Sequence, residues 1–305
     1  MAKKSETRKP ARAVKPAARA KAPARPKARK AVAKPAPRGL PVVVCCKWGR
    51  PFPAEYVNML CRAVADNLSE PHRFVCLTDD AKGLIPEVEA ISLPEMGIVE
   101  ERKGFGCWPK LSIFKPGIFG EDEIPVLYLD LDIMILRPID AYFQRIRELR
   151  GLNVQREWNP TLWSLAPLAL RPDRGVQGSV IGFYPSEQRH LYDRFVADPD
   201  AVYATCNDDQ VFITRESPQR RYWPFDWSSS FKWHCVKYFP LNRIFPKIRK
   251  PAKSKVLVFH GSPRPADLVR NDRSRWGTKR KFGYGPVDWV KEYWTRYGDK
   301  AQPRR

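Results

Sequence analysis

The sequence predicts an α/β fold, a mostly parallel sheet flanked by helices, from three segments near the start of its ordered part. Residues 41–47 and 73–78 are short apolar runs of the kind that forms buried strands. Between them, apolar residues recur at helical spacing over 53–67, which indicates an amphipathic helix. A strand, a helix and a second strand in this order are typical of a parallel, doubly wound sheet. Ligands bind such sheets outside the carboxyl ends of the strands.

Further apolar runs extend this pattern along the chain. Residues 125–130 are the clearest central strand, because four apolar residues lead directly into a carboxylate. The other expected elements are strands at 88–93, 178–184 and 255–260, a short helical piece at 108–114, and helices at 187–196 and 208–214.

The first 38 residues differ in composition from the rest of the chain. They are almost entirely Ala, Pro, Lys and Arg, with fourteen Lys and Arg against the single acid Glu6, so thirteen of the 22 net positive charges lie there. A segment without large apolar side chains cannot bury enough surface to offset the entropy lost on ordering. We therefore expect a disordered basic tail over 1–38 and a single domain over 39–305.

Cysteine usage and hydropathy predict the compartment. The seven cysteines are an odd number and form neither a CxxC pair nor a cluster with histidine, which favours reduced, buried thiols over disulfides or structural zinc. The longest apolar stretches fall short of the roughly 20 residues that cross a bilayer. We expect a cytoplasmic protein whose basic tail could bring it to the inner face of a membrane.

Two aspartates follow the central strand. Asp130 and Asp132 stand one residue apart at its carboxyl end, where both can reach a hard divalent cation that keeps other positions open for phosphate oxygens. A metal there could neutralise the negative charge of a departing diphosphate. The simpler interpretation of an isolated Asp-x-Asp is a pair of solvated loop acids, and the preceding apolar strand favours the metal site over it.

Further polar residues lie at the ends of expected elements. His260 ends an apolar strand; a lone histidine there is more often structural than a ligand. Gly261 would let backbone approach a ligand closely, and Arg264 offers a forked cation suited to phosphate. Asp208, Asp209 and Gln210 precede an apolar helical turn. An N-cap followed by an acid in the first turn would explain the two aspartates, although capping does not prevent Asp209 or Gln210 from facing a ligand.

A lysine and an aromatic stretch complete the candidates. Lys110 follows Trp108 and Pro109, which would fix its approach to a ligand, although a solvated lysine is the simpler interpretation. Residues 222–234 are rich in aromatic side chains, which either pack in the core or form a wall on which a sugar stacks. Asp226 in this stretch could accept a hydrogen bond from a hydroxyl group.

Taken in order over about residues 41–265, these segments resemble the retaining glycosyltransferases of family eight. That family includes glycogenin and the bacterial lipooligosaccharide galactosyltransferases, and it has the GT-A fold. The matching segments are Tyr128-Leu-Asp-Leu-Asp132 for the family's LYLDxD strand, Trp108-Pro-Lys-Leu111 for its basic donor segment, 178–183 for its NxGV strand, Asp209-Gln210 for its Asp-Gln pair, and His260 to Pro265 for its HxxGxxKP motif. The last motif is two residues shorter here and has Arg264 where lysine is usual, and Gln177-Gly178-Ser179 lacks the usual asparagine, which suggests a distant bacterial branch.

The resemblance implies a metal-dependent hexosyltransferase that moves a sugar from a nucleotide-sugar donor, a UDP-sugar, to a hydroxyl of a glycan, lipid or protein acceptor. It implies that Mn²⁺ or Mg²⁺ is bound by Asp130, Asp132 and His260. It further implies donor binding by Lys110, Asp130, Gly178, Gly261 and Arg264, and positions facing the transferred sugar or acceptor for the catalytic candidates Asp209 and Gln210.

Two other functions stay open at this point. A phosphohydrolase of the haloacid dehalogenase type also carries Asp-x-Asp after a strand, but Met134 replaces its usual small residue and the strand lies far from the start of the domain. A non-catalytic protein that uses the basic tail to bind nucleic acid or another anionic surface would show salt-sensitive affinity without sequence preference.

Overall fold

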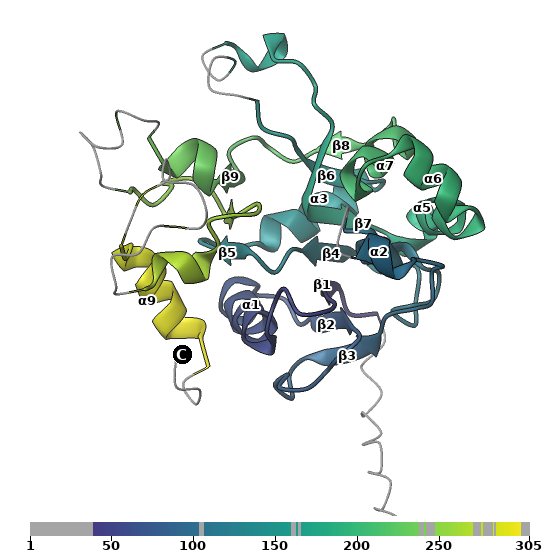
Figure 1. The fold of residues 1–305 in the computed structure, drawn as a ribbon, viewed down its shortest axis with the longest axis horizontal. Helices are drawn as coiled ribbons and strands as arrows, with labels where there is room; N and C mark the ends of the chain where they lie inside the picture. The colour runs from purple at the N-terminus through teal and green to yellow at the C-terminus, as the bar shows by residue number, and fades with distance from the viewer. Residues whose placement is uncertain are drawn as a thin grey trace, which may run out of the picture. The chain divides into compact units, whose positions relative to one another are not determined.

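A seven-stranded sheet forms the centre of the fold (Figure 1), with the strand order β3-β2-β1-β4-β7-β6-β8. The computed structural model describes residues 39–103, 107–159, 163, 166–237, 241, 248–270, 276, 283 and 285–299, so the tail expected over 1–38 lies outside the described residues. The strands are β1 (Val42–Lys47), β2 (Arg73–Thr78), β3 (Glu89–Ser92), β4 (Val126–Leu129), β6 (Asn153–Arg156), β7 (Val176–Phe183) and β8 (Arg221–Tyr222).

The sheet is mostly parallel, as predicted. Strand β1 pairs in parallel with β2 and β4, and β2 pairs in parallel with β3. Only β7 is reversed, because it pairs antiparallel with both β4 and β6, while β6 pairs in parallel with β8. The carboxyl ends of β1, β2 and β4 therefore meet at one edge of the sheet.

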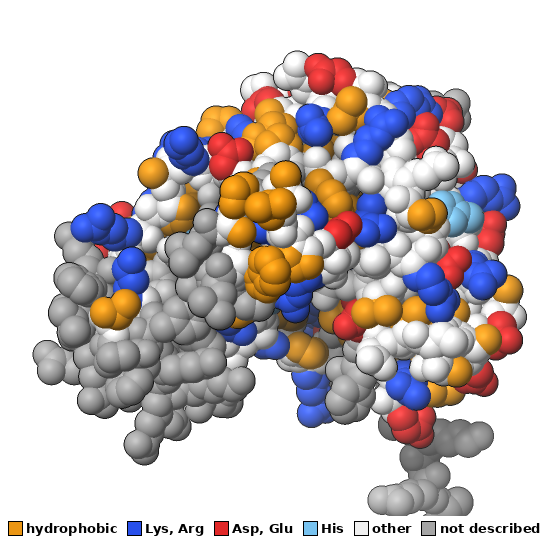
Figure 2. All heavy atoms as spheres, turned by 90° about the horizontal axis from the view of Figure 1, so that it is seen from above, with side chains coloured by type: hydrophobic (Ala, Val, Ile, Leu, Met, Phe, Trp, Pro, Cys, Tyr) orange, Lys and Arg blue, Asp and Glu red, His pale blue; other side chains and the backbone are white. Residues whose placement is uncertain are grey.

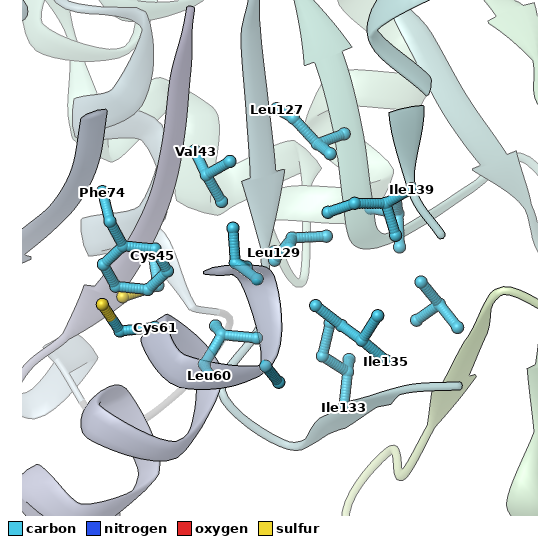
Figure 3. Packing of buried hydrophobic residues seen from close by; sticks show 14 of the residues in the cluster. Val43, Cys45, Leu60, Cys61, Phe74, Leu127, Leu129, Ile133, Ile135 and Ile139 are labelled. Atoms are coloured by element: carbon cyan, nitrogen blue, oxygen red, sulfur yellow. The ribbon is translucent and has the colours of Figure 1, made fainter. Parts of the chain in front are cut away.

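Apolar side chains cover both faces of this sheet. On one face, Val43 and Cys45 pack with Leu127 and Leu129 against helix α1, as Figure 3 shows. Their neighbours on the same strands, such as Val44 and Tyr128, belong to a second cluster on the other face. Alternate residues of one strand point to opposite faces, so a strand buried on both sides is a continuous apolar run.

Most of the helices contribute to one of these two clusters. Residues of α1, α3 and α9 join the first cluster, and residues of α5, α7 and the 3-10 helix η1 join the second. The helices are α1 (Ala54–Asn67), α2 (Glu100–Lys103), α3 (Asp140–Leu149), α5 (Pro185–Ala197), α6 (Pro199–Thr205), α7 (Asp209–Glu216) and α9 (Asp288–Tyr297), with 3-10 helices η1 (Trp108–Phe114), η2 (Leu168–Leu170) and η4 (Pro265–Leu268) and a π-helical turn η3 (Phe231–Cys235). Within the described residues, no helix is both long and apolar enough to span a bilayer.

A small second sheet adjoins the carboxyl end of β4 (Figure 1). It has the order β5-β10-β9 and consists of β5 (Ile133–Ile135), β9 (Ser228–Ser230) and β10 (Val256–Val258). Strand β10 pairs antiparallel with β5 and parallel with β9. The last predicted strand, at 255–260, therefore lies in this second sheet and is shorter than expected.

Candidate active site

The two aspartates of the Asp-x-Asp segment lie where the chain passes from one sheet to the other. The amide of Asp130 donates to the carbonyl of Ser179 on β7 at 3.0 Å, which keeps Asp130 in the central sheet. The carbonyl of Asp132 accepts from the amide of Phe259 at 2.9 Å, which places Asp132 at the start of the small sheet. Leu131 between them is buried in the first apolar cluster. Backbone bonds on both sides thus hold the two carboxylates at fixed positions.

Both aspartates line a cleft of about 950 Å³. Its walls come from the ends of β1, β2, β3 and β4, from the segments that follow them, and from the starts of η1 and η4. The lining residues are Cys46, Trp48 to Phe52, Thr78, Asp79, Ser92 to Met96, Ile98, Cys107, Pro109, Tyr128, Asp130 to Asp132 and Arg264. The cleft is therefore outside the carboxyl ends of the parallel strands, where ligands of such sheets bind. Its volume lies at the upper end of the range of about 300–1,000 Å³ for small-molecule sites.

Lys110 is buried behind this cleft and joins three distant segments. Its side chain is only 4% exposed. The Nζ atom lies 3.1 Å from Oδ2 of Asp209 and 3.3 Å from Oδ1 of Asp130, and it donates to the carbonyl of Gly178 at 3.2 Å. The expectation of a solvated lysine is therefore wrong for Lys110, because two carboxylates and a carbonyl replace its water.

Helix η1 holds Lys110 in this position. The ring of Trp108, directly before Pro109, is buried and stacks on Phe195 of α5 with ring centroids 5.4 Å apart. A bulky ring anchored in the core on one side of Pro109 leaves the lysine little freedom on the other, as the sequence suggested.

Gly178 and Gln210 complete the cluster around Lys110. The amide of Gly178 donates to Oε1 of Gln210 at 2.9 Å. A Cβ atom added at Gly178 would lie 3.1 Å from Nζ of Lys110 and 3.4 Å from Oδ2 of Asp209. Glycine at this position therefore leaves room for the polar cluster.

Asp209 and Gln210 face this cluster although they start a helix. Asp208 is the N-cap of α7, since its Oδ1 accepts from the amide of Val211 at 2.9 Å. Asp208 thus makes the capping expected at this segment, and the side chains of Asp209 and Gln210 lie in the cluster around Lys110.

The carboxyl group of Asp209 is strongly perturbed. Burial raises its pKa to about 6, although the ammonium group of Lys110 acts in the opposite direction. Its Oδ2 lies 3.1 Å from Nζ of Lys110, and no other described residue donates a hydrogen bond to it. A carboxylate oxygen has two lone pairs, so Oδ2 could also accept from a hydroxyl group of a ligand.

The shifted pKa values of Lys110 and Asp132 show that the site is rich in negative charge. Burial alone would lower the pKa of Lys110, but Asp130 and then Asp209 more than reverse this effect, so the lysine stays protonated. Burial and then repulsion from Asp130 raise the pKa of Asp132 to about 8, with partial relief from Lys110 and Arg264. A cation next to both aspartates would remove this repulsion. The oxygen ligands of Asp130 and Asp132 therefore fit a hard divalent ion.

His260 lies next to this segment but is held by other partners. Its Nε2 lies 2.6 Å from Oγ of Ser230, and its ring stacks on Trp158 with centroids 5.7 Å apart. Burial, Lys232 and His234 lower the pKa of His260 to about 4, so the imidazole is neutral. A neutral imidazole can bind a metal, but here only Nδ1 could do so because Nε2 contacts Ser230. Among the residues that the structure describes, no three His, Cys, Asp or Glu side chains form a group that could hold a metal ion.

Gly261 and Arg264 follow His260 in the chain, and Arg264 lines the cleft. Gly261 has a φ of 72°, a conformation that favours glycine. The guanidinium of Arg264 lies 4.3 Å from the ring centroid of Phe52, and its Nη1 donates to the carbonyl of Pro51 at 2.7 Å. Arg264 thus connects η4 to the segment after β1 and brings a positive charge to the cleft.

Sequence reasoning missed several residues of this region. Tyr128 donates to Oδ1 of Asp130 at 2.5 Å, and Ser230 and Trp158 hold His260. The Asp-x-Asp pattern pointed to the strand of Tyr128 but not to its hydroxyl group. In the aromatic stretch, Trp223 packs in the core as expected, and Asp226 is not among the residues that line the cleft.

Comparison with known proteins identifies the fold. No family model and no curated protein sequence matches the chain. Among solved structures, an active-site variant of LgtC is similar with a TM-score of 0.54 and 14% identity, over 86% of this chain and 98% of that chain. The galactosyltransferase LgtC in complex with donor and acceptor sugar analogues is similar with a TM-score of 0.50, again with 14% identity over 86% and 98% of the two chains. The chain therefore has the GT-A fold of glycosyltransferases such as LgtC, as the resemblance of its motifs predicted.

Proposed function

We propose that this protein is a glycosyltransferase that moves a sugar from a nucleotide-sugar donor to an acceptor hydroxyl group. One observation carries the proposal: the cleft of about 950 Å³ has Asp130 and Asp132 at its edge and the cluster of Lys110, Asp209 and Gln210 behind them. The similar LgtC was solved with donor and acceptor sugar analogues. A UDP-sugar is the donor that the family resemblance favours.

The diphosphate of the donor would lie between Arg264 and the two aspartates. Asp130 and Asp132 would hold Mn²⁺ or Mg²⁺, with His260 as a third candidate ligand through Nδ1. When bound, such an ion supplies positive charge that stabilises the leaving diphosphate. Arg264 adds a second positive charge from the wall of the cleft, and it is suited to bidentate contact with phosphate oxygens.

The buried cluster would hold the sugar. Oδ2 of Asp209 can accept a hydrogen bond from a hydroxyl group of the transferred sugar or the acceptor. Since Oε1 of Gln210 already accepts from the amide of Gly178, its amide nitrogen is the group that can donate to a sugar oxygen. Lys110 remains protonated, so it serves as a fixed charge that orients Asp209 and Asp130 and not as a base. Gly261 would let the backbone approach the donor.

A panel of nucleotide diphosphates tests this proposal. UDP, GDP, ADP and dTDP are added with Mn²⁺, with Mg²⁺ or with a chelator, and the melting temperature is measured. We expect at least one nucleotide to raise it only when the metal is present, and its sugar derivatives to be hydrolysed slowly without acceptor. The proposal fails if no nucleotide diphosphate changes the melting temperature under any metal condition.

We further propose that residues 1–38 make a peripheral contact with an anionic surface, either a membrane or nucleic acid. A membrane contact would keep the enzyme at the inner face of the cytoplasmic membrane. The support is the net charge of thirteen in this segment. On the face of the domain shown in Figure 2, the Lys and Arg side chains of the described residues are interspersed with Asp and Glu. Residues 39–305 carry the other nine net positive charges, so the density of net positive charge is greatest in residues 1–38.

A further inference from the structure

Tyr128 contacts the first aspartate of the site through its hydroxyl group. It lies in β4, and the whole residue is only 1% exposed. Its hydroxyl group donates to Oδ1 of Asp130 at 2.5 Å, and the same oxygen lies 3.3 Å from Nζ of Lys110. Two donors therefore converge on one carboxylate oxygen, which leaves Oδ2 as the oxygen best placed for a ligand in the cleft.

The strand fixes the geometry of this contact. Side chains two residues apart on a strand point to the same face, so a tyrosine two positions before Asp130 lies on the same side of the sheet. Tyr128 pairs with Val44 on one side and with Ile181 on the other, so its backbone cannot shift. The ring also lies 5.3 Å from Nζ of Lys110. The hydroxyl group is thus held at a constant distance from the carboxylate.

Lys110 alone does not select one oxygen of Asp130. An ammonium group is a compact point charge without the directional fork of a guanidinium, so even a held Nζ atom can pair with either oxygen of a carboxylate. Without the tyrosine hydroxyl, the carboxylate of Asp130 could rotate and offer Oδ2 to Lys110 as well. That rotation would withdraw from the cleft the oxygen that a cation or a donor hydroxyl needs.

We propose that Tyr128 is a positioning residue that holds Asp130 with Oδ2 directed into the cleft, an inference that rests on the proposed function of Asp130. Its hydroxyl group occupies Oδ1 together with Lys110. Binding of the divalent ion by Asp130 then needs no reorientation of the carboxylate. Loss of a partner that orients a metal ligand typically lowers metal affinity about 10- to 100-fold.

Tyr128→Phe tests this role, because it removes one oxygen atom and keeps the ring. Tyr142→Phe is the matched control: Tyr142 is also fully buried, and its hydroxyl group contacts Oγ of Ser228 at 3.2 Å on the other apolar cluster. The Kd of Mn²⁺ is measured by calorimetry for each protein, alone and with UDP. We expect Tyr128→Phe to raise this Kd about 10- to 100-fold and to lower kcat more than it raises the KM of the donor. Tyr142→Phe should leave the Kd and the kinetics unchanged.

A double-mutant cycle with Asp130→Asn separates positioning from a general structural role. If Tyr128 acts through Asp130, adding Tyr128→Phe to Asp130→Asn should change the Kd of Mn²⁺ less than twofold. The positioning role would be overturned if the effects of the two substitutions on the Kd of Mn²⁺ multiply, or if Tyr128→Phe binds Mn²⁺ as well as the wild type. Either result would leave the proposed function itself standing. A wild-type protein that takes up no metal with any nucleotide would overturn the metal site of the proposed function and this role with it.

Discussion

Replacing Lys110 by methionine should destabilise the protein by about 2.5–4 kcal/mol, which overlaps the usual cost of about 3–5 kcal/mol for breaking a buried ion pair from one side. Methionine has a similar length and no branch, so the change removes charge more than volume. It leaves the carboxylate of Asp209, which is only 1% exposed, without the ammonium group at 3.1 Å. It also removes the charged hydrogen bond to the carbonyl of Gly178.

The magnitude follows from two contributions. Burial raises the pKa of Asp209 to about 6 even with Lys110 in place, so this carboxylate already costs about 3 kcal/mol near neutral pH. Without Lys110 the pKa of Asp209 would rise further. Once this pKa exceeds 7, the carboxyl group is protonated at pH 7, so its cost to folding cannot exceed about 4 kcal/mol, which is about 1 kcal/mol more than with Lys110 in place. The lost charged hydrogen bond to Gly178 adds about 1.5–3 kcal/mol.

Urea unfolding of four proteins checks this reasoning: the wild type, Lys110→Met, Asp209→Asn and the double variant. The double variant should recover much of the stability lost in Lys110→Met, because it leaves no unpaired charge at Asp209. Lys82→Met is the control; Lys82 is exposed, so the change should stay within about 0.5 kcal/mol. A cost of less than about 1 kcal/mol for Lys110→Met, or two single effects that simply add, would contradict a buried ion pair between Lys110 and Asp209.

Four other predictions concern separate parts of the chain. Asp132→Asn should abolish donor turnover yet leave the melting temperature with chelator equal or higher, since burial and Asp130 raise the pKa of this carboxyl to about 8; a lower melting temperature would contradict this. Gly182→Ala should lower the free energy of unfolding in urea by about 1–3 kcal/mol and leave donor binding intact, because its methyl group would come within 2.7 Å of core side chains. Gly178→Ala should instead lower turnover more than stability, because its methyl group would meet Lys110 and Asp209. Glu157→Gln should raise the melting temperature at pH 7 but not at pH 4. Burial raises the pKa of the Glu157 carboxyl in the folded protein, so this group destabilises the fold only when the pH is above the ordinary pKa of a glutamate. Removing residues 1–38 should leave the melting temperature and donor hydrolysis unchanged but abolish most binding to anionic vesicles in a flotation assay; equal binding before and after would place the anionic contact on the domain.

The central strands could be predicted because their signal is local. The runs at 41–47, 73–78 and 125–130 are apolar throughout, and a strand covered on both faces requires this composition. The small second sheet could not be predicted in this way. Strand β5 has only three residues, Ile133–Ile135, which is too few to show the alternation of apolar and polar residues that indicates a strand. Its partner β10 lies more than a hundred residues away in the sequence.

The direction of β7 also depended on tertiary structure. Its apolar sequence at Val176–Phe183 suits a parallel or an antiparallel strand equally, because side chains alternate in both. Only its pairing with β4 and β6 reverses it. This reversal brings Gly178 at the start of β7 to the carboxyl end of β4, beside Asp130.

The sequence alone therefore determined the fold class and located Asp130 and Asp132 at a strand end, since apolar runs and the residues that end them are local features. Only the tertiary structure decided that Lys110 is buried between two carboxylates and that Nε2 of His260 contacts Ser230. The environment of a polar side chain depends on which distant segments surround it, and in this protein those segments are between 20 and 99 residues away from Lys110 and 30 residues away from His260.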